Sequence, residues 1–237
     1  MKPPRCRLNN VMWIVRIAAV VLLLAGCTDR APRGGGDVLV LGDSVLAWNA
    51  TKGASIPDVM GQALGRTVIS KAVPGAQFDN GSTLAGAVGF DIQRQFPGGR
   101  WNWIVLNGGA NDLSADCGCG ACGATVDGLI SQDGSGAVPA FITRMQRETG
   151  ARVIWMGYYK GNGKGSFEGC RDDLVEMERR LAQYAAGRDG VFFVDSEDVI
   201  DPRDPAQFAP DNNHPSVKGS ALIGNYLAQT IQLRSQN

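Results

Sequence analysis

The sequence has little of what several classes of protein require. Histidine occurs only once, at His214, and basic and acidic residues are equal in number, 23 of each. Because no basic excess is left to neutralise a phosphate backbone, the composition argues against nucleic-acid binding. The apolar run from Ile17 to Gly26 covers only ten residues, about half of the roughly 20 that a membrane-spanning helix needs.

The first 26 residues have the pattern of a secretory signal peptide, since the apolar run follows a basic segment without acidic residues. Leu24-Ala25-Gly26-Cys27 resembles the lipobox of bacterial lipoproteins, in which cleavage precedes a cysteine that is then lipidated. We therefore expect residues 1–26 to be removed, Cys27 to carry the lipid, and residues 27–36 to form a tether. An ordinary signal peptide and an uncleaved anchor are the alternatives.

Removal of that signal leaves 19 basic and 23 acidic residues, a formal charge of −4. The signal pattern and Cys27 together predict an exported protein that faces the periplasm and is attached to the membrane by lipid. Thr28 rather than Asp follows Cys27, so the resemblance to bacterial lipoproteins implies the outer membrane if the host is Gram-negative.

Residues 37–237 have the length and pattern of a single α/β domain. Five short apolar runs are continuous rather than alternating, which is typical of strands covered on both faces of a parallel sheet. These runs are 38–41, 68–69, 103–106, 153–156 and 191–194. Helical patterns separate most of them, including a capping box at Ser55–Asp58, so a doubly wound α/β fold is expected. Two glycine-rich segments, 114–136 and 160–169, are predicted to be long loops near the ligand-binding edge of the sheet.

Two polar segments that follow predicted strands carry a serine in one case and a histidine with a nearby aspartate in the other. Ser44 follows the first strand in Gly42-Asp43-Ser44, although the G-x-S-x-G motif of α/β-hydrolases is absent. His214 lies before the last helix, three residues after Asp211. An imidazole can take the serine proton, and a carboxylate can hold the imidazole in the required tautomer. Alone, Ser44 fits an ordinary turn or helix cap, and His214 fits an ordinary surface or core residue.

Acyl transfer also needs hydrogen-bond donors for the oxyanion. Asn111 follows the third strand and offers a side-chain amide, and Gly75 follows the second strand and offers a backbone N–H. The blocks Gly42-Asp43-Ser44, Gly75, Gly109-x-Asn111-Asp112 and Asp211-x-x-His214 together resemble the SGNH/GDSL hydrolase family, in order and spacing, over nearly the whole mature chain.

The resemblance implies a flavodoxin-like three-layer α/β/α sandwich with a five-stranded parallel sheet, and neither a metal nor a cofactor. It implies that Ser44 is the nucleophile, His214 the base and then acid, and Asp211 the residue that orients His214. The oxyanion hole would consist of the Ser44 and Gly75 N–H groups and the Asn111 amide. Asp112 would support the loop.

Four cysteines remain after the signal and Cys27: Cys117, Cys119, Cys122 and Cys170. A zinc site is one alternative, but an oxidising compartment favours two disulfides. We expect one bridge to tie Cys170 to the 117–122 segment. Because a Cys117–Cys119 ring would be strained, Cys117–Cys122 with Cys119–Cys170, and Cys119–Cys122 with Cys117–Cys170, both stay open.

The expected function is hydrolysis of a carboxylic ester or thioester through an acyl-enzyme, by a monomer acting on a small-molecule acyl ester. Trp48, Phe78, Tyr158 and Tyr159 are candidates for the walls of an acyl pocket. The same residues could serve an O-acyltransferase or a carbohydrate deacetylase. A lipoprotein that binds a glycan or lipid without turnover is the remaining alternative.

Overall fold

The computed structural model describes residues 35–236. The predicted signal peptide, the predicted lipidation site Cys27 and most of the predicted tether lie outside these residues. Within them, no helix has the length and apolar character to cross a membrane.

The described chain is built on one parallel sheet of five strands in the order β2-β1-β3-β4-β5. This order and the helices on both faces confirm the predicted three-layer α/β/α fold. Each strand contains the apolar run that predicted it. The strands are β1 (Gly35–Leu41), β2 (Val68–Ser70), β3 (Arg100–Leu106), β4 (Arg152–Met156) and β5 (Val191–Val194).

The order in which strands are added to the sheet reverses direction at β1. The chain passes from β1 to β2 on one side and then returns to β3 on the other side, so that Val40 pairs with both Ser70 and Val105. In open α/β sheets, ligands bind beyond the carboxyl ends of the strands at such a switch point. The segments that follow Leu41 and Leu106 are therefore the expected place for a site.

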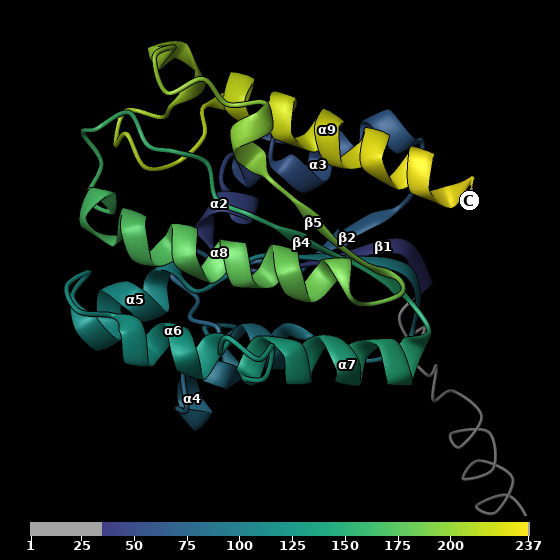
Figure 1. Cartoon of the computed structure of the whole chain (residues 1–237). Coiled ribbons are helices and arrows are strands. Elements are labelled where there is room, and N and C mark those ends of the chain that lie inside the picture. Colours follow the sequence, from purple (N-terminus) through teal and green to yellow (C-terminus); the bar gives the residue numbers. More distant parts are fainter. Residues whose placement is uncertain (1–34, 237) are drawn as a thin grey trace, which may run out of the picture. The chain divides into compact units, whose positions relative to one another are not determined.

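Helices cover both faces of the sheet (Figure 1). On one face lie α3 (Ile56–Leu64) and α9 (Val217–Ser235), which pack against each other. On the other lie α5 (Ala110–Cys117), α6 (Gly123–Leu129), α7 (Ala137–Thr149) and α8 (Arg171–Ala186). The short elements are α2 (Ser44–Ala47), α4 (Thr83–Ala87), η1 (Ala50–Lys52), η2 (Ile92–Gln95), η3 (Glu168–Cys170), η4 (Ser196–Asp198) and η5 (Pro205–Gln207).

The predicted capping box is confirmed at the start of α3. The Ser55 side chain accepts from the Asp58 N–H, and the Asp58 carboxylate accepts from the Ser55 N–H. The prediction of a long loop over 114–136 is wrong, because this segment holds the end of α5 and the whole of α6. Glycine and cysteine have low intrinsic helix propensity, so the local sequence does not predict so short a helix. Tertiary contacts outweigh that low propensity.

Two disulfides hold this segment, Cys117–Cys122 and Cys119–Cys170. They confirm the expected tie to Cys170 and select one of the two pairings that the sequence left open. They also exclude a zinc site made of four free thiolates. The second bridge joins Cys119, two residues beyond the end of α5, to Cys170 in η3, which runs directly into α8.

The two bridges differ in the length of chain that they close, and we expect their removal to differ accordingly. Replacing Cys119 and Cys170 by Ala opens a loop of 51 residues, which should lower the free energy of unfolding by about 4 kcal/mol. Replacing Cys117 and Cys122 opens a loop of five residues and should cost about 2 kcal/mol. Urea denaturation of both double variants measures the difference.

The comparison is matched because each double variant removes one fully buried cysteine, Cys170 or Cys122. Equal losses, or a larger loss for the Cys117/Cys122 pair, would contradict an entropic role for the longer bridge.

Candidate active site

The turn after β1 is fixed by side chains from outside the turn. The Gly42 N–H donates to Gln95 Oε1 at 2.7 Å, and Gln95 Nε2 donates to the Gly42 carbonyl at 2.9 Å. The Asp43 N–H donates to Asn107 Oδ1 at 3.2 Å. Gly42 has φ +153°, and a Cβ there would lie 2.0 Å from Asn107 Oδ1. The close approach of Asn107 therefore requires glycine at position 42, directly before Asp43 and Ser44.

A buried carboxylate links three strand ends at this turn. Asp43 accepts hydrogen bonds from the Tyr158 hydroxyl at 2.5 Å, from Asn107 Nδ2 at 3.1 Å and from the Val45 N–H at 2.9 Å. Burial raises the pKa of Asp43, and the three hydrogen bonds oppose that rise. Burial and the neighbouring Asp43 raise the pKa of Tyr158, so Tyr158 stays protonated and donates. The Tyr158 hydroxyl also accepts from the Ala110 N–H, which ties α5 to the same network.

Ser44, His214 and Asp211 form a hydrogen-bonded chain. Ser44 begins α2, and its Oγ lies 2.7 Å from His214 Nε2. His214 Nδ1 lies 2.6 Å from Asp211 Oδ2. The Asp211 carboxylate also accepts the N–H groups of Asn213 and His214, each at 3.0 Å. Partial burial raises the pKa of Asp211, but these hydrogen bonds outweigh burial and hold the pKa below its usual range.

The loop that carries His214 is anchored from two sides. The Tyr159 hydroxyl, after β4, donates to the Asn213 carbonyl at 2.7 Å. Asn49, after α2, donates to the Pro215 carbonyl at 3.1 Å and to Ser220 Oγ at 3.0 Å. The Asn49 bonds join the segment of Ser44 directly to the segment of His214. The distance between the Ser44 and His214 side chains thus depends on more than their own contact.

The indole of Trp48 lies flat on the imidazole of His214. The ring centroids are 3.7 Å apart, and the planes differ by 7°. Trp48 follows α2 and so comes from the same short segment as Ser44. This stack restrains rotation of the imidazole, while the hydrogen bond to Asp211 fixes the Nδ1 edge of the ring.

Asn111 and the segment that follows Gly75 meet next to the hydrogen-bonded residues Ser44, His214 and Asp211. Asn111, in the first turn of α5, donates one Nδ2 hydrogen to the Ala76 carbonyl at 2.9 Å. The second hydrogen of that amide is available to another acceptor. Asp112 accepts from the N–H groups of Phe78 and Asp79, and so ties the same segment to α5. Burial raises the pKa of Asp112 to about 6, although these backbone bonds oppose the rise.

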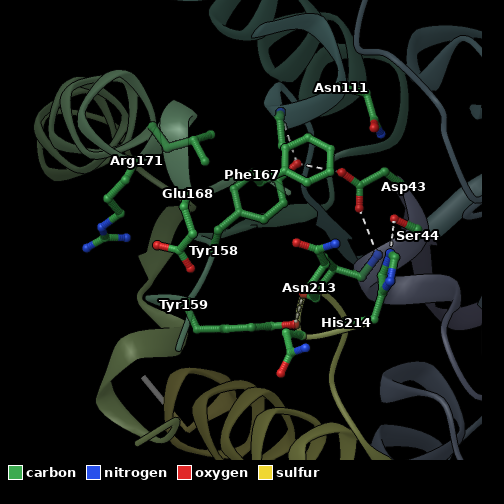
Figure 2. A pocket seen from close by; sticks show the side chains of 15 residues that line it. Asp43, Ser44, Asn111, Tyr158, Tyr159, Phe167, Glu168, Arg171, Asn213 and His214 are labelled. Atoms are coloured by element: carbon green, nitrogen blue, oxygen red, sulfur yellow. Dashed lines mark hydrogen bonds between the residues drawn. The ribbon is translucent and has the colours of Figure 1, made fainter. Parts of the chain in front are cut away.

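A pocket with a volume of about 70 Å³ opens over Ser44. Figure 2 shows Ser44 and His214 at one end, and Glu168 and Arg171 at the other. Arg171 is paired with Glu197. Most of the lining comes from segments that follow β1, β3 and β4 and from the loop of His214. The lining residues are Asp43, Ser44, Val45, Ala110, Asn111, Tyr158, Tyr159, Gly161, Phe167, Glu168, Arg171, Leu174, Asn212, Asn213 and His214.

The structure gathers most of the residues that the sequence singled out. Ser44, Asn111 and His214 line this pocket, and Asp211 is bonded to His214. Gly75 does not line the pocket, but it directly precedes Ala76, which accepts from Asn111. Among residues 35–236, no group of three or more His, Cys, Asp or Glu side chains is placed to hold a metal ion.

The aromatic candidates divide. Tyr158 and Tyr159 line the pocket, whereas Trp48 stacks on His214 beside it. Phe78 is fully buried against Phe141 and Trp155, so its prediction as a pocket wall is wrong. Its backbone N–H faces Asp112 while its ring fills the core, which a sequence position alone does not reveal.

Sequence reasoning missed the far end of the pocket. Phe167 and Glu168 come from the end of a glycine-rich loop, and Arg171 and Leu174 come from the first turn of α8. Their sole signal was the position of that loop after β4, at the carboxyl edge of the sheet. Gln95, which holds Gly42, had no signal at all.

Fold and site together define a doubly wound α/β protein with a serine, a histidine and an aspartate in hydrogen-bond contact at the carboxyl edge of the sheet. Residues 40–222 match the model of the GDSL-like Lipase/Acylhydrolase family. The chain therefore belongs to the GDSL-like lipase/acylhydrolase family. No curated protein matches it.

Solved structures with the same fold include three enzymes. A candidate SGNH hydrolase from Slackia heliotrinireducens is 22% identical with a TM-score of 0.53, over 82% of this chain and 97% of that one. A carbohydrate acetylesterase from Sinorhizobium meliloti is 15% identical with a TM-score of 0.53, over 83% and 98%. A family two carbohydrate esterase from Clostridium thermocellum is 16% identical with a TM-score of 0.56, over 84% and 64%. At these identities the likeness shows a shared fold.

The turn before Ser44 gives a direct test of how the site is built. We expect Gly42→Ala to lower the free energy of unfolding by about 3 kcal/mol or more, because the new Cβ collides with Asn107 at an unfavourable φ. Gly53→Ala is the matched control, since Gly53 has φ +62° and nothing within 4 Å of an added Cβ. That variant should lose about 1 kcal/mol. Thermal and urea unfolding of both proteins measure the difference, and similar losses would show that Asn107 can move aside.

Proposed function

We propose that this protein hydrolyses carboxylic esters or thioesters through an acyl-enzyme formed on Ser44. The observation that carries the proposal is the chain Ser44 Oγ to His214 Nε2 at 2.7 Å and His214 Nδ1 to Asp211 at 2.6 Å. A serine hydroxyl is a weak nucleophile until a base in contact with it takes its proton. Membership of an acylhydrolase family supports the same chemistry.

Each residue has a defined part in the proposed reaction. Ser44 Oγ attacks the carbonyl carbon as His214 Nε2 takes its proton, and Asp211 accepts the Nδ1 hydrogen and stabilises the imidazolium. The carbonyl oxygen becomes an oxyanion, for which the Ser44 N–H, the Gly75 N–H and the free Asn111 Nδ2 hydrogen are the proposed donors. His214 then gives its proton to the leaving alcohol or thiol. Water, activated by the same imidazole, releases the acid from Ser44.

The size of the pocket favours a short acyl group. About 70 Å³ is far below the roughly 300–1,000 Å³ of sites that enclose a drug-sized ligand. The walls beside Ser44 are close-packed, because Val45, Tyr158, Tyr159 and Leu174 are all buried. The fold shared with a carbohydrate acetylesterase is consistent with such a group. We therefore place acetyl and similarly small acyl esters first among the substrates.

We expect Ser44→Ala to lower kcat for p-nitrophenyl acetate by about 10⁴-fold or more, because the nucleophile and base act as one unit. Ser44→Ala should also lose labelling by a fluorophosphonate, while its thermal unfolding stays near that of the wild type. Ser131→Ala, a change of the same kind at a half-buried position outside the pocket, is the control and should keep both labelling and turnover. Near-normal hydrolysis by Ser44→Ala would refute the mechanism.

Asn111→Ala should lower kcat by about 10²–10³ with little change in KM, as expected for the loss of one oxyanion donor. Asn102→Ala is the matched control. Asn102 lies near the start of β3, and its side-chain amide also donates one hydrogen bond, to Asp37. Steady-state kinetics on both variants separate the two constants. A rise in KM alone would show that Asn111 binds the ground-state substrate and does not stabilise the oxyanion.

A further inference from the structure

A second cavity, which we call the Trp48 groove, lies beside the pocket over Ser44. Its volume is about 790 Å³, more than ten times that of the pocket. Three parts of the chain line it: residues 47–52, the segment after β2, and the residues on either side of the His214 loop. The lining residues are Ala47, Trp48, Asn49, Ala50, Thr51, Lys52, Ala72, Pro74, Phe208, Ala209, Pro210, Ser216 and Val217.

The groove adjoins the reacting groups through their immediate neighbours. Trp48 lines the groove and stacks on His214, so one side chain contacts both the groove and the imidazole. Pro74 precedes Gly75, the proposed oxyanion donor, and Pro210 precedes Asp211. A molecule in the groove therefore lies against three segments that carry the reaction, on the side of His214.

The position of His214 decides which half of an ester belongs there. The proton that leaves Ser44 passes through His214 Nε2 to the oxygen of the departing alcohol. That alcohol must lie next to His214 when the carbon–oxygen bond breaks, whereas the acyl group stays on Ser44. The close-packed pocket around Ser44 has room for only a small acyl group, but the groove beside His214 is open and large.

The walls of the groove suit a flat apolar surface. The rings of Trp48 and Phe208 and the prolines Pro74 and Pro210 line it. Phe208 is itself held edge-to-face against Tyr159, with ring centroids 5.8 Å apart. Lys52, Thr51 and Ser216 add polar groups to the lining. Aromatic and proline surfaces bind ring faces at little cost in side-chain entropy, because these side chains are already rigid.

We propose that the Trp48 groove is the binding site for the alcohol half of the substrate, a bulky alcohol with an apolar ring face that is larger than its acyl group. This inference rests on the proposed ester hydrolysis and specifies its substrate class. In the step concerned, the bond from Ser44 Oγ to the carbonyl carbon forms and the bond from that carbon to the alcohol oxygen breaks. The proton of Ser44 reaches that oxygen through His214, and the alcohol departs into the groove.

The test fills the groove without touching the reacting residues. Ala50→Trp places an indole on the exposed η1 wall, and Ala63→Trp, exposed on α3 and outside the groove, is the matched control. Ethyl, benzyl and 2-naphthylmethyl acetates share one acyl group and differ in the size of the alcohol. A pH-stat measures kcat/KM for each ester with wild type and both variants.

We expect the wild type to prefer naphthylmethyl acetate to ethyl acetate. Ala50→Trp should reduce that preference about tenfold or more, and Ala63→Trp should leave it unchanged. No loss of preference in Ala50→Trp would overturn the proposal. The proposal would also be overturned if Ala50→Trp lost selectivity between p-nitrophenyl acetate and p-nitrophenyl octanoate, because these esters differ only in the acyl group.

The experiment distinguishes an error in the proposed alcohol site from an error in the proposed ester hydrolysis. If the groove does not bind the alcohol, the wild type still hydrolyses all three acetates and Ser44 is still labelled by the fluorophosphonate. If the protein is not an esterase, the wild type shows neither hydrolysis nor labelling.

Discussion

The site depends on one buried carboxylate. Asp43 sits where β1 ends and receives hydrogen bonds from Tyr158, beyond β4, and from Asn107, beyond β3. A buried carboxylate is costly unless donors surround it, so the three strand ends must keep these positions together. Ser44 is the next residue, and its direction follows from that arrangement. The triad geometry is thus a consequence of how the sheet edge satisfies Asp43.

The architecture was predictable because the sheet is covered on both faces. Continuous apolar runs such as 38–41 leave few alternatives to a buried strand, and all five lie in the observed strands. The segment 114–136 was not predictable in the same way. Its helices are short, rich in glycine and held by disulfides, so their stability comes from distant contacts and covalent bonds that local sequence preferences do not contain.

The chemistry of the site was easier to predict than its surroundings. Ser44, Asp211 and His214 were identified because a nucleophile, a base and an orienting acid must be of these types, and the structure places them in contact. The residues that line the pocket are constrained only by packing. An aromatic residue in the sequence does not reveal whether its ring will line the pocket or enter the core. Phe78 and Trp48 illustrate this point: one ring entered the core, and the other stacked on His214.

The Cys119–Cys170 bridge has a consequence for how the active site matures. It joins α5, which begins with Ala110 and Asn111 at the pocket, to η3 and α8, which carry Glu168 and Arg171 at the opposite end. The two ends of the pocket are therefore joined by a covalent bond formed after synthesis. Before the bridge forms, the spacing between these two ends depends on packing and hydrogen bonds alone, and oxidation adds a covalent restraint to it.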